Sequence, residues 1–228
     1  MTQKIHIVDQ HHQVLNSWAE LRRKLPEPPA VWSLDYHTDT LPAFRGEKPA
    51  PEFGDFRHPE KVSDAVAALR HDEHFDWALR SGIVSGIHLG ICGAETDIIA
   101  HPAISVRRPA GLPAPEIILN TPEDARAMLE NFLSDETLIQ MFPRLPRPGE
   151  KYILDIDCDC ILCRRTLCPA SAAIWTELLK NASLITLSRE NDWVRILKLP
   201  GETITGDEIA GIIQNEAGAL QRSKPSLM

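Results

Sequence analysis

The sequence predicts an α/β fold: three layers, αβα, around a mainly parallel sheet. Short apolar runs bounded by turn residues alternate with amphipathic stretches along the chain, which is the pattern of repeated βα units. Several of these runs are apolar almost throughout, as strands covered on both faces must be. With 228 residues, of which 43% are apolar, we expect a single domain over residues 1–228 that ends in a disordered tail at 222–228.

Six strands and six helices are expected in chain order. The strands are expected at residues 4–8, 30–34, 83–91, 116–119, 151–156 and 183–187. The helices are expected at residues 12–24, 59–71, 73–81, 121–134, 169–180 and 205–221. The fourth helix has the clearest start, because Thr121 is a cap residue, Pro122 stands at the first helical position and two acids follow. Proline collects at 25–59, 102–115 and 142–148, so these segments are expected to be connections.

Charge and hydropathy exclude two classes of partner. Asp and Glu number 32 against 24 Lys and Arg, for a net charge of −8, so there is no broad basic field for a nucleic-acid backbone or an anionic bilayer. No stretch approaches 18 uncharged apolar residues, and no signal-peptide run follows the first residues. We expect a soluble, cytoplasmic protein with no nucleic-acid or membrane partner, and the sequence leaves its oligomeric state open.

The first candidate site follows the second expected strand. Asp35, His37 and Asp39 stand at alternating positions as that apolar strand ends. Alternate side chains of an extended chain share a face, so these three can converge on one point. Two oxygen donors and one nitrogen donor suit a divalent ion such as Mn²⁺ or Zn²⁺. A solvated strand end rich in polar residues would give the same pattern.

A second strand end carries the same alternation of polar residues, with Asp155, Asp157 and Asp159. Strand propensity does not favour Asp, and like charges on one face repel each other unless cations neutralise them. Four of the carboxylates from the two segments would meet at one place, which suggests two adjacent ions. These four are Asp35, Asp39, Asp155 and Asp157.

The two segments resemble the arginase and ureohydrolase superfamily, in which an Asp-x-His-x-Asp strand end and an Asp-x-Asp strand end hold a pair of manganese ions. The closer likeness is to the peptide arginases and their uncharacterised relatives. It runs in order from about residue 5 to 195 and adds a His-containing opening at 8–15, a segment at 72–78 and a late strand ending at 185–190. The Gly-Gly-Asp-His opening of the ordinary arginases is absent. The resemblance implies an arginase-like fold.

The resemblance also implies a ligand set. The implied ligands are His11 and His37 at the outer ends of the two ions, Asp35 and Asp155 as bridges, and Asp39 and Asp157 to complete the shells. His12 competes with His11, because adjacent residues at a helix start point in different directions. Asp159 is expected to lie behind the ligands or to be exposed.

In that superfamily water activated by the ions attacks the guanidinium carbon and releases urea and an amine. By the resemblance, Asp39 would accept a proton from the nucleophile, His74 would protonate the leaving amine and Glu190 would hold the guanidinium. His74 can also be read as a surface residue after helix-capping acids, and Glu190 as an ordinary strand-terminal acid.

The resemblance therefore implies a hydrolase with two Mn²⁺ ions per chain that converts arginine side chains of a peptide or protein to ornithine and urea. Two alternatives stay open. One is an enzyme acting on a free small guanidino compound or another C–N amide bond. The other is a non-catalytic metal-binding or partner-binding domain of the same fold.

The cysteines form a separate candidate site. Four of the five are Cys158, Cys160, Cys163 and Cys168. If the strand continued through them, the alternation of side chains would turn Cys158 and Cys160 away from the neighbouring aspartates and into the core, where free Cys behaves as a small hydrophobe. The spacing matches no common zinc or iron–sulfur site well. We expect reduced core thiols, with a structural metal as the alternative.

Overall fold

The computed structural model describes residues 4–45, 55–93, 98–112 and 123–222. Its strands form one sheet in the order β1-β6-β5-β2-β3-β4, and every neighbouring pair is parallel. The strands are β1 (Lys4–Val8), β2 (Ala30–Asp35), β3 (Gly86–Ile91), β4 (Ile104–Arg107), β5 (Tyr152–Asp157) and β6 (Leu184–Ser188). The predicted class, α/β with a parallel sheet, is confirmed.

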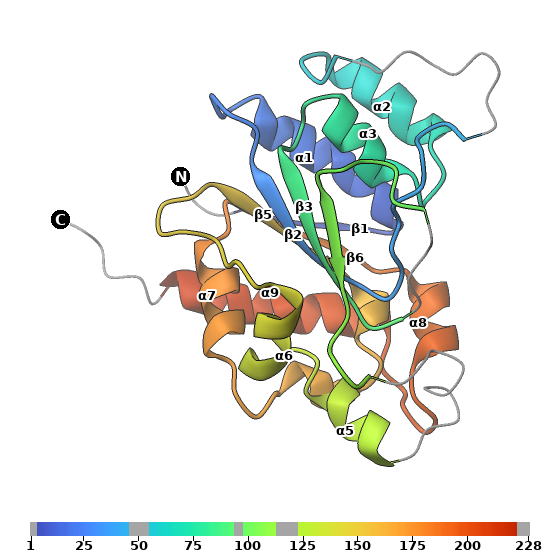
Figure 1. Ribbon diagram of the computed structural model, residues 1–228, viewed down its shortest axis with the longest axis vertical. Coiled ribbons are helices and arrows are strands. Elements are labelled where there is room, and N and C mark those ends of the chain that lie inside the picture. Colours follow the sequence, from blue (N-terminus) through green and yellow to red (C-terminus); the bar gives the residue numbers. More distant parts are fainter. Residues whose placement is uncertain (1–3, 46–54, 94–97, 113–122, 223–228) are drawn as a thin grey trace.

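Helices cover both faces of the sheet, which gives the three layers (Figure 1). On one face lie α1 (Leu15–Arg22), α2 (Pro59–Ala68) and α3 (His74–Arg80). On the other face lie α5 (Glu123–Glu130), α6 (Asp135–Met141), α7 (Ala173–Asn181), α8 (Asn191–Leu197) and α9 (Gly206–Arg222). Three short 3₁₀ helices are η1 (His11–Val14), η2 (Cys158–Cys160) and η3 (Arg164–Leu167). No described helix is both long and apolar enough to cross a membrane.

Each face of the sheet carries its own apolar cluster. Val31 and Ile153 point to the face of α1, α2 and α3, where Trp18 is fully buried. Leu154, the next residue along β5, points to the other face and joins the cluster that contains Trp175. Because both faces are covered, the central strands β2 and β5 are largely apolar, as the sequence predicts, apart from Ser33, Asp35, Asp155 and Asp157.

The structure differs from the sequence-based assignment in three elements. The strand β4 lies inside the proline-rich segment 102–115, which was expected to be a connection; four residues between prolines are too short for a clear pattern. The expected helix 121–134 ends earlier, because Ser134 caps a separate helix, α6, by accepting a hydrogen bond from Thr137 N. The short helix α8 was not expected. The expected strand 116–119 and residues 223–228 of the expected tail lie outside the described residues.

The strand order puts the two acidic strand ends side by side. From β2 the chain adds β3 and β4 on one side, and then β5 and β6 on the other side. In open α/β sheets the crevice at such a reversal, outside the carboxyl ends of the strands, is where ligands bind. Leu34 pairs with Ile156 across β2 and β5, so Asp35 and Asp157 follow on neighbouring strands at this edge.

Candidate metal centre

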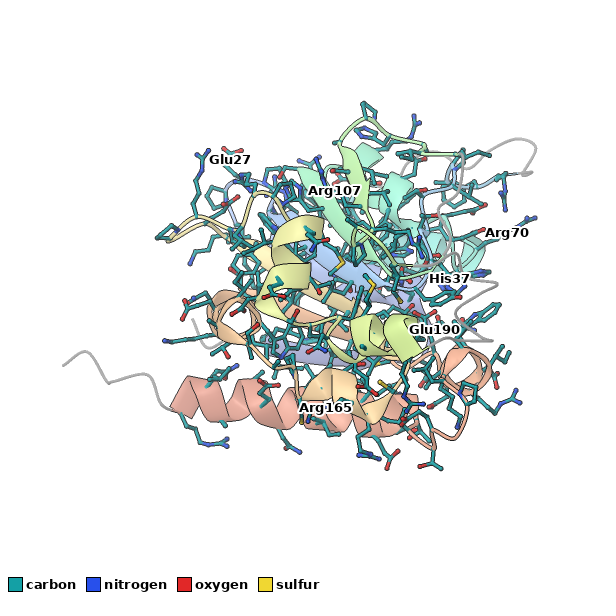
Figure 2. All side chains as sticks on the ribbon, turned by 60° about the horizontal axis from the view of Figure 1, so that its bottom comes forward. Glu27, His37, Arg70, Arg107, Arg165 and Glu190 are labelled. Carbon is teal, nitrogen blue, oxygen red and sulfur yellow. The ribbon has the colours of Figure 1, made fainter. Side chains whose placement is uncertain are left out.

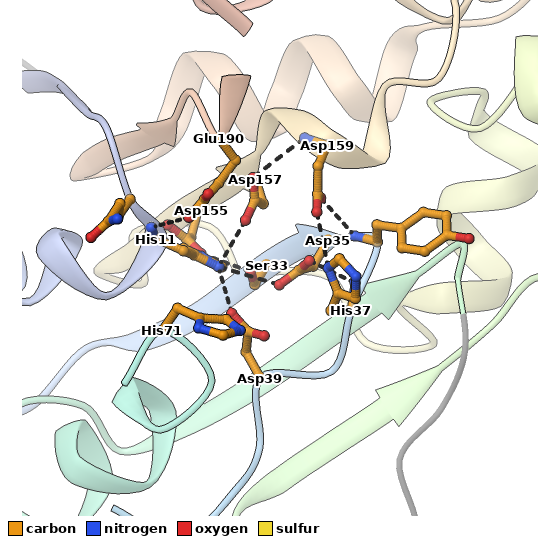
Figure 3. A network of polar contacts seen from close by, with 12 residues as sticks. His11, Ser33, Asp35, His37, Asp39, His71, Asp155, Asp157, Asp159 and Glu190 are labelled. Carbon is orange, nitrogen blue, oxygen red and sulfur yellow. Dashed lines mark hydrogen bonds and ion pairs between the residues drawn. The ribbon is translucent and has the colours of Figure 1, made fainter. Parts of the chain in front are cut away.

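A buried histidine lies among the carboxylates at the carboxyl edge of the sheet (Figure 3). The Nδ1 atom of His11 is 3.1 Å from Asp39 Oδ2, 3.2 Å from Asp157 Oδ2 and 3.3 Å from Asp35 Oδ2. All four side chains are buried, and their potential ligand atoms lie within 4.8 Å of one another. Four donors around one point make a group that could hold one cation.

A second group lies on the other side of Asp35. His37 Nδ1 is 3.0 Å from Asp159 Oδ2, and the backbone N–H of His37 donates to Asp35 Oδ1 at 2.8 Å. The ligand atoms of Asp35, His37 and Asp159 again lie within 4.8 Å of one another. Because Asp35 belongs to both groups, it is the residue that could bridge two ions.

The residues of both groups fit divalent cations. Asp35 Oδ2 and Asp159 Oδ2 are buried, and each faces one histidine Nδ1 atom, at 3.3 and 3.0 Å, without a well-aligned hydrogen bond from the described residues. Carboxylate oxygens and imidazole nitrogens are donors for ions such as Mn²⁺ and Zn²⁺. A pair of divalent ions would neutralise the carboxylates and occupy their unused lone pairs.

The carboxylates resist ionisation in the absence of cations. Burial, aided by the charge of Asp159, raises the pKa of Asp157 to about 6, and burial raises the pKa of Asp159 to about 6. Burial also holds the pKa of Asp39 well above its usual value. Burial alone would lower the pKa of His11, but Asp155 and Asp157 outweigh it and raise that pKa well above 6.5. Metal ions would displace protons from these groups on binding.

Asp155 does not lie where a carboxylate that bridges the two groups would lie. It lies inside β5, opposite Ser33 and Thr186 in the sheet, and accepts hydrogen bonds from both hydroxyls, at 2.7 and 2.5 Å. Its Oδ2 is also 2.7 Å from His11 Nε2. Asp155 belongs to neither of these two groups, nor to a third group of potential ligands among the described residues, which consists of His11, Asp39 and His74. A carboxylate that fixes one ring nitrogen leaves the other free for a metal, so this geometry suits an orienting residue rather than a ligand.

Asp159 lies in the second group of potential ligands, although the sequence pattern predicted it behind the ligands or on the surface. The strand β5 ends at Asp157, and η2 turns the chain so that Asp159 is 1% exposed and accepts a hydrogen bond from Tyr36 N at 3.1 Å. It therefore lies beside His37 instead of behind the ligands or on the surface. The alternation expected from an extended chain does not hold beyond the strand end.

The loop that carries Asp39 is held by two acids of the α3 region. Asp39 itself adopts a left-handed conformation, with φ of 45°, which costs energy and persists only where the surroundings hold it. Glu73 accepts hydrogen bonds from Phe44 N and Arg45 N, and Asp76 accepts one from Ala43 N. In the sequence these acids look like ordinary first-turn residues of a helix, so no local signal indicated this function.

His74 is more deeply buried than a proton donor at the mouth of a site needs to be. It is 0% exposed, its Nδ1 donates to His71 O at 3.0 Å, and its Nε2 has no described partner. Its ring lies 4.3 Å from the His11 ring, centroid to centroid, and Nδ1 is 3.9 Å from Asp39 Oδ2. Burial lowers the pKa of His74 well below 6.5, so the residue is neutral at pH 7. The geometry suits a group that packs against His11.

Glu190 lies at the start of α8, beside the histidine of the first group. Its Oε1 accepts a hydrogen bond from the backbone N–H of His11 at 2.7 Å. Its φ is 38°, and the turn is held by Arg189 N and Glu190 N, which donate to the carbonyls of Val8 and Asp9. Gly206 is needed at this turn, because a Cβ there would lie 1.9 Å from Arg189 O. Figure 2 shows Glu190 and His37 toward the same end of the molecule, away from Glu27.

Of the two adjacent histidines, His11 enters the cluster and His12 does not. His12 is half-buried and belongs to none of the candidate metal groups among the described residues. Both lie in η1, which begins three residues after Val8, the last residue of β1. The short 3₁₀ turn points the first residue toward β2 and β5.

The described cysteines belong to no group of candidate ligands, although Cys158 stands between Asp157 and Asp159 in the chain. Cys158 and Cys160 are buried free thiols, but η2 carries them, so the strand alternation that was to turn them inward is wrong beyond Asp157. Cys163 is buried and Cys168 is exposed. In the described part of the chain no cysteine belongs to a group that could hold a metal ion.

Comparison with known proteins gives little beyond the architecture. No protein-family model and no curated protein matches the chain. Four chains among the solved structures are similar in fold. One of them is formimidoylglutamase from Bacillus subtilis subsp. subtilis str. 168, with 12% sequence identity, a TM-score of 0.49 and coverage of 96% of this chain. The chain spans 61% of that protein's length. So remote a likeness assigns no activity.

Proposed function

We propose that this protein is a metal-dependent hydrolase of C–N bonds, of the arginase and ureohydrolase kind, with two divalent ions at the carboxyl ends of β2 and β5. The observation that carries the proposal is that two donor groups, the first buried and the second containing the half-buried His37, share one carboxylate, Asp35. A hydrolytic centre with two ions needs such a shared ligand, because the ions must be close enough to act on one water molecule.

The proposed ligands differ from those implied by the resemblance at one strand end. One ion would be held by His11 Nδ1, Asp35, Asp39 and Asp157, and the other by Asp35, His37 and Asp159. Asp155 would orient His11 from behind through Nε2. We propose Mn²⁺ as the metal, because hard oxygen donors predominate in both groups.

When bound, such ions lower the pKa of water and so supply a nucleophile near neutral pH. Asp39 is suited to accept the proton of that nucleophile, because its carboxylate lies in the first donor group beside Asp35 and Asp157. Glu190 is half-buried and negatively charged when ionised. It can accept two N–H groups of a planar guanidinium and hold the carbon close to the nucleophile.

For the substrate we propose an arginine side chain in a peptide or protein, which would be converted to ornithine and urea. Glu190 supports a cationic substrate, because a neutral amide needs no anion at that position. A free small guanidino compound, another C–N amide and a metal-binding domain without activity are the competing functions.

The test is urea release from an arginine-containing peptide by the purified protein, with and without Mn²⁺, together with metal analysis. We expect about two divalent ions per chain and urea formation that depends on them. Higher activity on free arginine would favour the small-molecule alternative. Bound metal with no hydrolysis of guanidino compounds or neutral amides would leave a binding domain.

A further inference from the structure

The helix next to the candidate centre presents apolar side chains to solvent. Trp193 is 37% exposed and Ile196 is 54% exposed, both on α8. On its other face α8 buries Val194 and Leu197 in the core. Exposed large apolar residues close to a functional site commonly mark a binding surface, and Trp193 and Ile196 are not needed to fill the core.

This apolar face begins at the proposed substrate clamp. Trp193 and Ile196 are three residues apart, so they lie on one side of α8, and Glu190 directly precedes the first residue of that helix. The Trp193 ring meets the His37 ring edge to face, with centroids 5.1 Å apart and an angle of 63°. The charged residues between them, Asp192 and Arg195, pair with each other at 3.4 Å. A neutral apolar track therefore leads outward from the centre.

We propose that Trp193 and Ile196 bind an apolar side chain that flanks the target arginine in a polypeptide substrate. The inference rests on the proposed function, and deepens it by naming the sequence context of the target. The track spans about 9 Å from Glu190 to Ile196 at about 1.5 Å per helical residue. An extended peptide advances about 3.3 Å per residue, so the track reaches side chains one to three positions from the arginine.

Continuity with the centre favours this occupant over the others. A polypeptide held by its arginine at Glu190 has to leave the site past a neighbouring surface, and α8 begins at the clamp itself. An anionic membrane is a poor match for a chain with a net charge of −8. Free arginine would leave the track empty.

The experiment compares two acetylated and amidated peptides, Gly-Leu-Arg-Leu-Gly and Gly-Gly-Arg-Gly-Gly, for urea release and for binding by calorimetry. For the Mn²⁺-loaded wild type we expect kcat/KM to be about tenfold or more higher for the leucine peptide. Trp193→Ala should bring that ratio close to one, mainly through KM, with metal content unchanged. Ile196→Ser should lower the ratio in part. Ile139→Ser, which alters an exposed isoleucine on α6, should leave it unchanged.

The two peptides separate failure of the inference from failure of the proposed function. A wild-type ratio near one, or an equal loss on both peptides in Trp193→Ala, overturns the apolar track even if urea is released. Loss of metal in Trp193→Ala would show that the ring only supports His37, which also overturns it. If no urea forms but the leucine peptide binds more tightly and Trp193→Ala removes the difference, the track stands and the hydrolase proposal falls.

Discussion

Replacing Asp35 by Asn should abolish the response of the protein to divalent metal while preserving its fold. Asp35 is fully buried and belongs to both donor groups, so each group loses one charged ligand. Asn has the same shape, and its carbonyl oxygen can still accept the hydrogen bond from His37 N. The substitution also removes one of several like charges, so the metal-free variant should be at least as stable as the metal-free wild type.

The size of the effect follows from mass action. A ligand at one hundred times its Kd stabilises the folded state by about 2.7 kcal/mol. For a chain of this length each kcal/mol raises Tm by about 2–4 °C, so each ion should raise the Tm of the wild type by about 5–11 °C. Asp35→Asn should show a shift close to zero for both ions.

The assay is thermal unfolding after removal of metal by EDTA and dialysis, with MnCl₂ added back in steps. Asp64→Asn is the matched control, because Asp64 is exposed on α2. If Asp35→Asn keeps the shift of the wild type, the shared-ligand assignment is refuted. Asp159→Asn provides a second variant, because only the second group contains it; it should lose about half of the metal-dependent shift.

Three further predictions follow from the site. Glu190→Gln should keep metal and fold but lose on the order of 10² in urea release, because it cannot hold a guanidinium by charge; near-normal turnover would remove the clamp role. Replacing Cys163 and Cys168 by Ser should leave the bound metal unchanged by elemental analysis, and loss of one zinc per chain would establish a separate structural site. In the metal-free protein, burial raises the pKa of Asp157 and Asp159 from 3.8 to about 6. The folded state therefore holds these protons more tightly than the unfolded state, and the free energy of unfolding should be highest below about pH 4 and should fall as the pH rises through 6. For Asp157 the loss of unfolding free energy is about 3 kcal/mol. Tm should depend less on pH when Mn²⁺ is present.

The sequence predicted where the candidate site lies better than how its side chains are arranged. Alternating acids after two apolar strands identified β2 and β5, and the strand order makes these neighbours. The alternation then failed at both strand ends, because β2 ends at Asp35 and β5 at Asp157. Beyond these points turns decide where side chains point, so Asp159 enters the site and Asp155 stays below it.

The remaining differences have a similar cause. Whether His11 or His12 enters the cluster depends on a four-residue 3₁₀ turn, for which the sequence has no periodic signal. The burial of His74 depends on packing against His11 and Trp18, which lie far from it along the chain. Tertiary contacts of this kind cannot be read from spacing alone.

The central claim is that two divalent ions share Asp35 at the carboxyl edge of the sheet. Crystals grown with Mn²⁺ and measured at the manganese absorption edge test it most directly. We expect two anomalous peaks on either side of the Asp35 carboxylate, one within bonding distance of His11 Nδ1 and the other beside His37 and Asp159. A single peak, a peak bonded to Asp155 instead of Asp159, or no peak at this edge would contradict the account.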